Sequence, residues 1–414
     1  MFKEKTDFEP WVIWGSAAFF AMFIFALQTS VSVMIPQLKA DFKSNDLQIG
    51  FLSSSFFYTY AFAQIPIGGL IDKFGTRRIL AVSTLGIVIS CFIFSISDSY
   101  AAALTARILM GLFAASAYPC AFCLAAVWFP SKLFTTVAGF TEMLGMLGAA
   151  FIADSLSKFV DFAGWRDSWY LLTIISLILT IIIFYCVKDG IKKNKLKIKR
   201  AQPTSFTKKI KVMLFSKTVW LYGLYSGLIF APLCAFAGLW GIPFVMSKYS
   251  LSVSGAGGYV MLIFLGAALG NLCIGKISDI FHNKTRLLYL GSIISLILSL
   301  VIIYIQLPLF IFSILMFIFG LVAAVYVLPF GEVKKVTPHE LRGTTLALTN
   351  AICGGLGTII LQPLIGYILH ILPSDNALWE YQIALALIPG SLALSLVFLF
   401  LIKRNNQKYH HHLN

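Results

Sequence analysis

The stretch that decides the fold is GGLIDKFGTRR, residues 68–78. It lies between two long apolar segments, Leu47–Leu70 and Ile79–Ile96. Three glycines, an Asp-Lys pair and two arginines indicate a short, basic, tightly turning loop between two membrane helices.

A second stretch of the same character, GKISDIFHNKTR at Gly275–Arg286, also follows a long apolar segment. Gly68 and Gly275 are separated by 207 positions, and Asp72 and Asp279 are separated by the same number. One shared offset for a loop of this kind predicts an internal repeat.

The composition indicates a membrane protein with many spans. Hydrophobic residues make up 59 % of the chain and charged residues 12 %, far from the usual balance of a soluble domain. Continuous apolar runs of about 18 residues or more favour membrane helices over barrel strands, which alternate at every second residue. We therefore expect an all-α polytopic membrane protein, with the lipid bilayer as its main partner and no binding of nucleic acid despite the net charge of +15.

The apolar runs predict twelve transmembrane helices, in two groups of six. The first apolar run is too long for a signal-peptide core and is interpreted as a transmembrane helix that is not cleaved off. The polar, basic segment 188–217 divides the chain into a six-helix bundle at 1–187 and a second at 218–414, which ends in a short tail. The predicted spans are 11–35, 47–70, 79–97, 101–127, 134–155, 168–187, 218–245, 255–277, 288–306, 308–331, 342–370 and 379–402.

The basic residues predict the orientation, because loops on the cytoplasmic side carry an excess of Lys and Arg. Of the 32 basic residues, 26 fall in the segments on the side of the two termini, 5 fall on the other side and Arg107 lies inside a span. Both termini, the central loop and the tail are therefore predicted to be cytoplasmic. The membrane is predicted to be the inner membrane of a bacterium.

The two halves align over most of their length. At the offset of 207, Pro36 matches Pro243, Gly50 matches Gly257 and Gln64 matches Asn271; with a drift of one or two positions, Gly111 matches Gly320 and Thr141-Glu142 matches Thr349-Asn350. Halves with an even number of spans are parallel repeats, and such repeats place a solute site at their interface near the middle of the membrane.

Residues 68–78 resemble the signature loop of the major facilitator superfamily. The matching positions are Gly68, Asp72, Lys73, Gly75, Arg77 and Arg78. Arg107 and Gly111 resemble the motif of the superfamily's fourth helix, and the stretch around Glu142 weakly resembles a subgroup of bacterial nutrient carriers that includes phagosomal amino-acid transporters. The resemblance implies a secondary transporter, not an enzyme, that alternates between inward-open and outward-open states.

The resemblance also implies that the loop is a cytoplasmic gate. Asp72 would contact the start of the eleventh helix near Arg342, where a carboxylate gains from the helix dipole. The acid that often pairs with the loop arginine is missing from the end of the fourth helix, so either the gate is weaker or Glu332 or Glu340 replaces that acid. Asp279 marks the weaker second copy of the gate. A simple basic loop without a gating role is the alternative.

Glu142 is the most informative single residue. It lies about nine residues into the fifth predicted span, roughly 13 Å deep at 1.5 Å per residue. A carboxyl group at that depth is costly, so it usually faces a cavity and marks the path of a solute or a proton. Its repeat mate Asn350 is polar but uncharged. A structural hydrogen bond between helices is the alternative.

Arg107 is the one basic residue in the interior of a predicted span, since Lys276 and Arg342 lie at the ends of theirs. Its guanidinium suits planar carboxylates and phosphates, so it is expected to bind an anionic solute group, to pair with Glu142, or both. A purely structural pair is the alternative. The weaker candidates for the same cavity include Gln28, Tyr60, Tyr118, Gln64, Asn271, Tyr225 and Tyr326, each of which can instead form a helix–helix hydrogen bond.

The leading hypothesis is proton-coupled uptake of a small zwitterionic or anionic organic solute, such as an amino acid, a short peptide or an organic acid. In this hypothesis Arg107 holds a carboxylate, and Glu142 holds an amine or the coupling proton. Export of a drug-like or siderophore-like compound is the alternative within transport, and a non-transporting membrane sensor is the alternative from another class. We expect a monomer without a cofactor. We also expect no metal ion, since the seven cysteines lie in apolar segments without ligand spacing.

Overall fold

The computed structural model describes residues 8–189, 216–280, 284–337, 342–372 and 374–411. For some helical residues in these ranges, including Asp72 and Asp279, only the backbone is described. Nearly all of the predicted central loop, 188–217, lies outside the described residues, as do Glu340 and the end of the tail.

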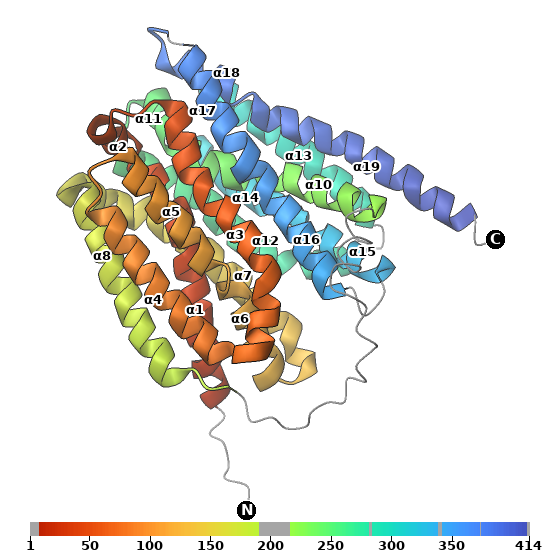
Figure 1. Cartoon of the computed structure of the whole chain (residues 1–414). Helices are drawn as coiled ribbons and strands as arrows, with labels where there is room; N and C mark the ends of the chain where they lie inside the picture. Colours follow the sequence, from red (N-terminus) through yellow and green to blue (C-terminus); the bar gives the residue numbers. More distant parts are fainter. Residues whose placement is uncertain (1–7, 190–215, 281–283, 338–341, 373, 412–414) are drawn as a thin grey trace, which may run out of the picture.

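The described part of the chain consists of helices joined by short turns and contains no strand (Figure 1). The helices of the first half are α1 (Glu9–Thr29), η1 (Ser30–Val33), α2 (Ile35–Phe42), α3 (Asp46–Phe74), α4 (Thr76–Ser95), α5 (Tyr100–Ala114), α6 (Ala117–Trp128), α7 (Ser131–Phe151), η2 (Ile152–Leu156) and α8 (Ser157–Cys186). Those of the second half are α10 (Lys217–Ala231), η3 (Pro232–Trp240), α11 (Gly241–Tyr249), α12 (Val253–Ile280), α13 (Lys284–Tyr304), α14 (Leu309–Ala323), η4 (Ala324–Val327), α15 (Leu328–Val336), α16 (Arg342–Gly355), η6 (Leu356–Leu361), α17 (Gln362–Ile371), α18 (Ala377–Ala384) and α19 (Leu387–His411).

Ten stretches of the described residues are long and apolar enough to cross a membrane. One of them, Thr136–Cys186, has 51 residues and is interrupted at Gly164, whose φ of 86° is left-handed. Helix α3, with 29 residues, is long enough to cross as well. The predicted number of twelve follows if this stretch crosses twice and α3 once, and it stays a prediction.

The sixth predicted span needs a correction. It was expected to begin at residue 168 after a loop, but the chain is helical from Ser157 to Cys186 apart from the break at Gly164. The residues that were expected to form a loop are therefore helical, and glycine supplies the one backbone conformation that turns the chain there.

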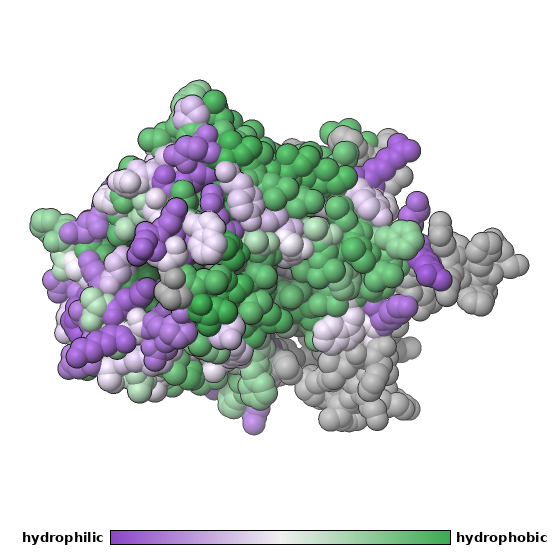
Figure 2. Space-filling view, turned by 90° about the horizontal axis from the view of Figure 1, so that it is seen from above, coloured by the Kyte–Doolittle hydropathy of each residue, from purple (hydrophilic) through white to green (hydrophobic). Residues whose placement is uncertain are grey.

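Apolar side chains cover the middle of the face that Figure 2 shows. Hydrophilic residues gather at one end of the helix bundle and again at the opposite end, with apolar side chains between them. The helices α1 and α19 begin and end, respectively, at the same end of the bundle, which we call the termini end; α2, α11 and α18 lie at the other end, which we call the far end (Figure 1).

The repeat predicted from sequence recurs in the packing of the helices. Gly111 of α5 lies directly against the backbone of Phe56 in α3, and its mate Gly320 of α14 lies against the backbone of Ile263 in α12. A β-carbon would clash at either glycine. Gly148 and Gly357 form a second matched pair, packed against Met22 and Ala231.

The departures from α-helix recur in the same way. The 3₁₀ segment η1 corresponds to the π-helical η3, the π-helical η2 corresponds to η6, and the turn at Ala115 and Ser116 corresponds to η4, at offsets of 207 to 209 positions. Non-α segments within helices often mark functional sites and hinges. Their repetition supports two related halves that carry irregular helix at matching depths.

The two ends of the bundle differ in how closely the halves approach each other. At the far end, Gly50 of α3 lies against the backbone of Gln362 and Pro363, 2.9 Å from the position of a β-carbon, and Gly257 of α12 lies against the backbone of Ala153. At the termini end, Gly68 and Gly275 have no such neighbour within 4 Å. The molecule is thus closed at the far end and more open at the termini end.

Candidate functional site

Glu142 lies in α7, and its side chain is half-buried. Among the described residues, no hydrogen bond or ion pair reaches its carboxylate. A carboxylate inside membrane-spanning helices is costly when it lacks partners. The alternative, in which Glu142 forms a structural hydrogen bond between helices, is therefore not found among the described residues.

Side chains from four other segments lie near this carboxylate. Tyr60 of α3, Tyr118 of α6, Tyr326 of η4 and Cys353 of α16 all lie close enough to interact electrostatically with Glu142. Two of the four come from each half of the chain. Glu142 therefore faces a polar and aromatic region where the two halves meet.

The predicted pair of polar repeat mates belongs to this region. Gln64 lies beside the hydroxyl of Tyr60, and Asn271 lies beside the hydroxyl of Tyr326. Both amide atoms of Asn271 are buried without a partner at hydrogen-bond distance. An apolar ring also packs there: the ring centroid of Phe230 lies 4.5 Å from that of Tyr326.

Tyr118 is held against α7 by a glycine. The side chain is 8 % exposed, and its hydroxyl is buried without a hydrogen bond. A β-carbon at Gly145, one helical turn after Glu142, would collide with that hydroxyl. Unpaired buried polar groups cost about 1–3 kcal/mol each, so Tyr118 and Asn271 are groups that a bound solute or water would stabilise.

Arg107 has different surroundings. It is 0 % exposed and donates hydrogen bonds to the carbonyl oxygens of Leu27 (2.8 Å) and Gln28 (3.3 Å) in α1 and of Leu52 (3.4 Å) and Ser53 (3.2 Å) in α3. Its guanidinium carbon lies 5.0 Å from the ring centroid of Phe56. The expected pairing with Glu142 is not found among the described residues, because the guanidinium is bonded to backbone carbonyls instead.

The remaining cavity candidates lie in three different settings. The backbone carbonyl of Gln28 accepts from Arg107. Asn350 is exposed on α16, three residues before Cys353. Tyr225 is buried between α10 and α13, where its hydroxyl lies 3.2 Å from the carbonyl oxygen of Leu288 and 3.2 Å from the hydroxyl of Ser292. Tyr225 therefore joins helices within the second half.

The stretch 68–78 was expected to be a loop, but it is helical on both sides of Gly75, since α3 continues to Phe74 and α4 begins at Thr76. The turn at Gly75 is supported by Phe184 of α8 and by Asp189, which follows α8. Gly75 separates α3 from α4 with a φ of 83°. The backbone amide of Arg77 donates to a carboxylate oxygen of Asp189 at 3.0 Å, and its guanidinium donates to the carbonyl oxygen of Phe184 at 2.8 Å. The acid that serves this loop is thus Asp189, which sequence reasoning missed.

The other residues of the predicted gate are either exposed or have side chains outside the described part of the structure. Lys73 and Arg78 are exposed, and Gly68 lies in open space. The side chains of Asp72 and Asp279 are outside the described residues, so the expected contact with the eleventh helix remains a prediction. Glu332 forms an ion pair with Lys284 at 3.4 Å; Lys284 is the repeat mate of Arg77 at the offset of 207.

Of the residues near Glu142, Cys353 was not a sequence candidate for the site, and Tyr60 was only a weak one. Tyr60 lies one turn before Gln64 on α3, so it shares the face of that candidate. Cys353 lies three residues after Asn350, as Gly145 lies three residues after Glu142. The repeat offset therefore contained a signal for Cys353.

Comparisons with known proteins agree with this architecture. The D-galactonate transporter of Escherichia coli O6:H1 is 23 % identical over 82 % of this chain and 85 % of its own length. The probable sulfoacetate transporter SauU of Cupriavidus necator is 27 % identical over 40 % of this chain, and that match spans only 39 % of SauU.

The fold is found in solved structures as well. A bacterial homologue of the human lysosomal transporter Spinster, in an inward-facing and occupied conformation, superposes with a TM-score of 0.80 at 15 % identity, over 97 % of this chain and 98 % of that one. The family model described as Major Facilitator Superfamily matches residues 17–362 and, in a second match, 240–411. The resemblance of the loop at 68–78 is thereby confirmed: this chain is an integral membrane protein that belongs to the Major Facilitator Superfamily.

Proposed function

We propose that this protein is a proton-coupled secondary transporter that takes up a small anionic or zwitterionic organic solute by alternating access. The observation that carries the proposal is the setting of Glu142. Its carboxylate is half-buried where the two halves meet, three tyrosines lie near it, and no described residue pairs with it.

A single unpaired carboxylate can couple a proton to an anion by charge alone. When Glu142 is ionised, a second negative charge a few ångströms away is repelled strongly, because the surroundings have a low dielectric constant. When Glu142 carries a proton, that repulsion disappears. The anion and the proton then bind and cross the membrane together.

Neutral groups would hold the solute. The hydroxyls of Tyr118 and Tyr326 and the amides of Asn271 and Gln64 can donate hydrogen bonds to a carboxylate or hydroxyl group. Asn350 lies on α16 near the same region and is proposed as a further contact. The names of two relatives, which denote transporters of D-galactonate and sulfoacetate, support an organic acid as the solute.

Arg107 takes a different role in this proposal. Because its guanidinium is bonded to the backbone of α1 and α3, it positions the helices that carry Gln28 and Tyr60. The sequence had suggested that Arg107 holds the carboxylate of the solute. In the conformation described here its side chain is fully buried among backbone carbonyls.

The orientation and location complete the proposal. The excess of basic residues on the side of the termini supports termini in the cytoplasm of a bacterium and the chain in its inner membrane. The termini end, where Gly68 and Gly275 have open space, would then face the cytoplasm. We propose that the monomer is the transporting unit.

Two experiments in sequence test the function. A thermal-shift screen of the purified protein against sugar acids, sulfonates, amino acids and short peptides identifies a ligand, since binding to the folded state raises the melting temperature. Proteoliposomes then measure uptake of that ligand with and without an inward proton gradient.

Glu142→Gln is the decisive variant, because glutamine imitates the protonated carboxyl group. We expect it to keep ligand binding and to lose accumulation driven by the proton gradient. Asp154→Asn is the matched control, since Asp154 is also an acid of this region of the chain but pairs with Lys158 at 2.8 Å. Accumulation by Glu142→Gln at the wild-type level would contradict the proposed role of Glu142.

A further inference from the structure

The first turn of α12 is capped by a residue from the other half of the chain. The backbone amide of Ser254 donates a hydrogen bond of 3.0 Å to a carboxylate oxygen of Asp161 in α8. The hydroxyl of Ser252 accepts from the amide of Gly255 at 3.1 Å. Two amides in the first turn of α12 therefore donate hydrogen bonds to side chains, one to the neighbouring Ser252 and one to Asp161 of the other half.

This arrangement is electrostatically favourable. The first amides of a helix have no partners within the helix, and a negative charge near them is stabilised by the helix dipole. Asp161 is exposed and accepts from one of these amides. It thus provides a contact that links the two halves at the far end.

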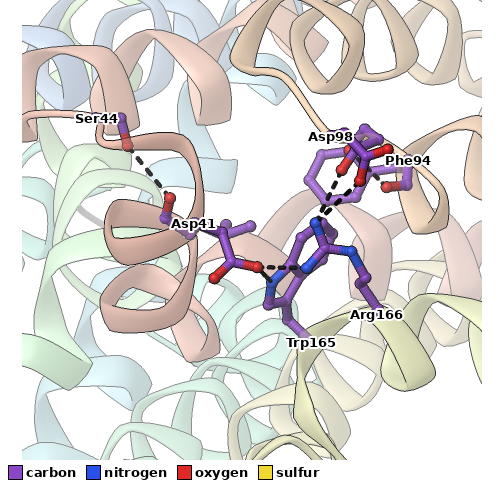
Figure 3. A network of polar contacts seen from close by, with 8 residues as sticks. Asp41, Ser44, Phe94, Asp98, Trp165 and Arg166 are labelled. Carbon is purple, nitrogen blue, oxygen red and sulfur yellow. Dashed lines mark hydrogen bonds and ion pairs between the residues drawn. The ribbon is translucent and has the colours of Figure 1, made fainter.

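The segment that carries Asp161 is held in place by its own half. The side-chain amide of Gln37 donates to the carbonyl oxygen of Val160 at 3.3 Å. Just past the break at Gly164, Trp165 donates to Asp41 at 2.9 Å, and Arg166 bonds both Asp41 and Asp98 (Figure 3). Asp161 is therefore presented to α12 by a supported segment.

The contact lies at a junction where the halves are packed closely. One turn further along α12, Gly257 lies against the backbone of Ala153 and the hydroxyl of Ser157. The matching junction between α3 and α17 is also closed, with Gly366 against the backbone of Asp46. Opening of the far end requires both junctions to separate, and the first of them includes the bond to Asp161.

We propose that Asp161 is a latch that favours the conformation closed at the far end. The bond between its carboxylate and the amide of Ser254 exists only while α8 and α12 touch, so it stabilises that state and not the state open at the far end. This proposal rests on the proposed function in one respect only, namely that the far end opens and closes during alternating access. It does not depend on Glu142, on protons or on the identity of the solute.

Hydrogen–deuterium exchange of the full-length protein in lipid nanodiscs tests the latch. In Asp161→Ala, the population open at the far end should rise about two- to five-fold, the factor that corresponds to an exposed charge at a helix dipole. Exchange should therefore increase by a similar factor in the start of α12 and also in the distant junction of α3 with α17. Peptides of the termini end should become more protected.

Two further variants keep the test specific. Asp161→Asn retains an acceptor without the charge and should give a smaller increase at both junctions. Asp167→Ala removes an exposed acid from the same helix for which no interaction is found within the described residues, and it should behave as the wild type. The latch is refuted if Asp161→Ala changes exchange only at the start of α12, or leaves it unchanged.

Discussion

Two charged residues within the membrane-spanning helices, Arg107 and Glu142, have opposite surroundings. Arg107 is fully buried and bonded to four backbone carbonyls. Glu142 is half-buried and bonded to no described residue. A charge inside a membrane protein is costly in either setting, but only an unsatisfied charge is available to bind a proton or a solute. This difference is the basis for the proposal that the arginine is structural and the glutamate functional.

The largest effect on stability is expected at Arg107. Arg107→Ala removes the side chain that joins α5 to α1 and α3, so the free energy of unfolding should fall on the order of 3 kcal/mol. The melting temperature of the purified protein measures this loss. Glu142→Gln should melt within a degree or two of the wild type, because no described bond is broken.

Arg107→Lys sharpens this prediction. Lysine keeps the charge but cannot place donors toward two helices in a planar arrangement, so its melting temperature should lie between those of the wild type and Arg107→Ala. If Arg107→Lys were as stable as the wild type but failed to bind the ligand from the screen, the guanidinium would be a solute contact and the comparison would be wrong.

A smaller effect is expected at Gly145, which belongs to the surroundings of Glu142. Gly145→Ala adds a methyl group where the hydroxyl of Tyr118 lies, and overpacking of this kind costs about 1–3 kcal/mol. Because the displaced group lies beside Glu142, transport should fall about ten-fold while the protein stays folded. Uptake in proteoliposomes is the measurement.

Gly139→Ala is the control on the same helix, since its β-carbon would meet nothing within 4 Å. This variant should transport as the wild type does. Equal losses in Gly139→Ala and Gly145→Ala would mean that α7 tolerates no added side chain, and that the position of Tyr118 is not the cause.

The smallest effect is expected from a charge at the surface. Hydrogen bonds from Trp165 and Arg166 hold the pKa of Asp41 below its usual value of 3.8. The ionised carboxylate therefore stabilises the folded state at neutral pH, and this contribution is lost as the pH falls below 3.8 through the lowered value. Since the pair is exposed, Asp41→Asn should cost less than about 1 kcal/mol.

The measurement for Asp41 is the difference in melting temperature between the variant and the wild type as a function of pH. The difference should be present at pH 7 and should shrink below pH 3.8. A difference that is independent of pH would assign the effect to packing of Trp165 and not to the charge of Asp41.

The fold could be predicted from sequence because its signals are local or periodic. Long apolar runs indicated the helices, and the offset of 207 positions indicated which glycines would occupy matching contacts, as Gly111 and Gly320 do. The break at Gly164 was missed, since a single left-handed glycine within an apolar pattern does not distinguish a turn within a helix from a loop.

The candidate site was predicted only in part, because the sequence indicates where a polar residue lies but not which groups it bonds to. The position of Glu142 inside a span follows from the sequence, and so do Gln64 and Asn271 as repeat mates. The partners of Arg107 do not, because they are backbone carbonyls, which every residue possesses. Asp189 was missed for a related reason: it lies 112 positions from Arg77, and only the folded chain brings the two together.

The measurement that most directly tests the account compares two modes of transport in Glu142→Gln, with the ligand found by thermal shift. Exchange of labelled for unlabelled ligand needs no net proton movement, whereas accumulation under a gradient of one pH unit can reach about ten-fold when one proton accompanies each solute. We predict that the variant keeps exchange, makes it independent of pH, and accumulates nothing above the external concentration. Accumulation by Glu142→Gln that still follows the proton gradient would contradict the account.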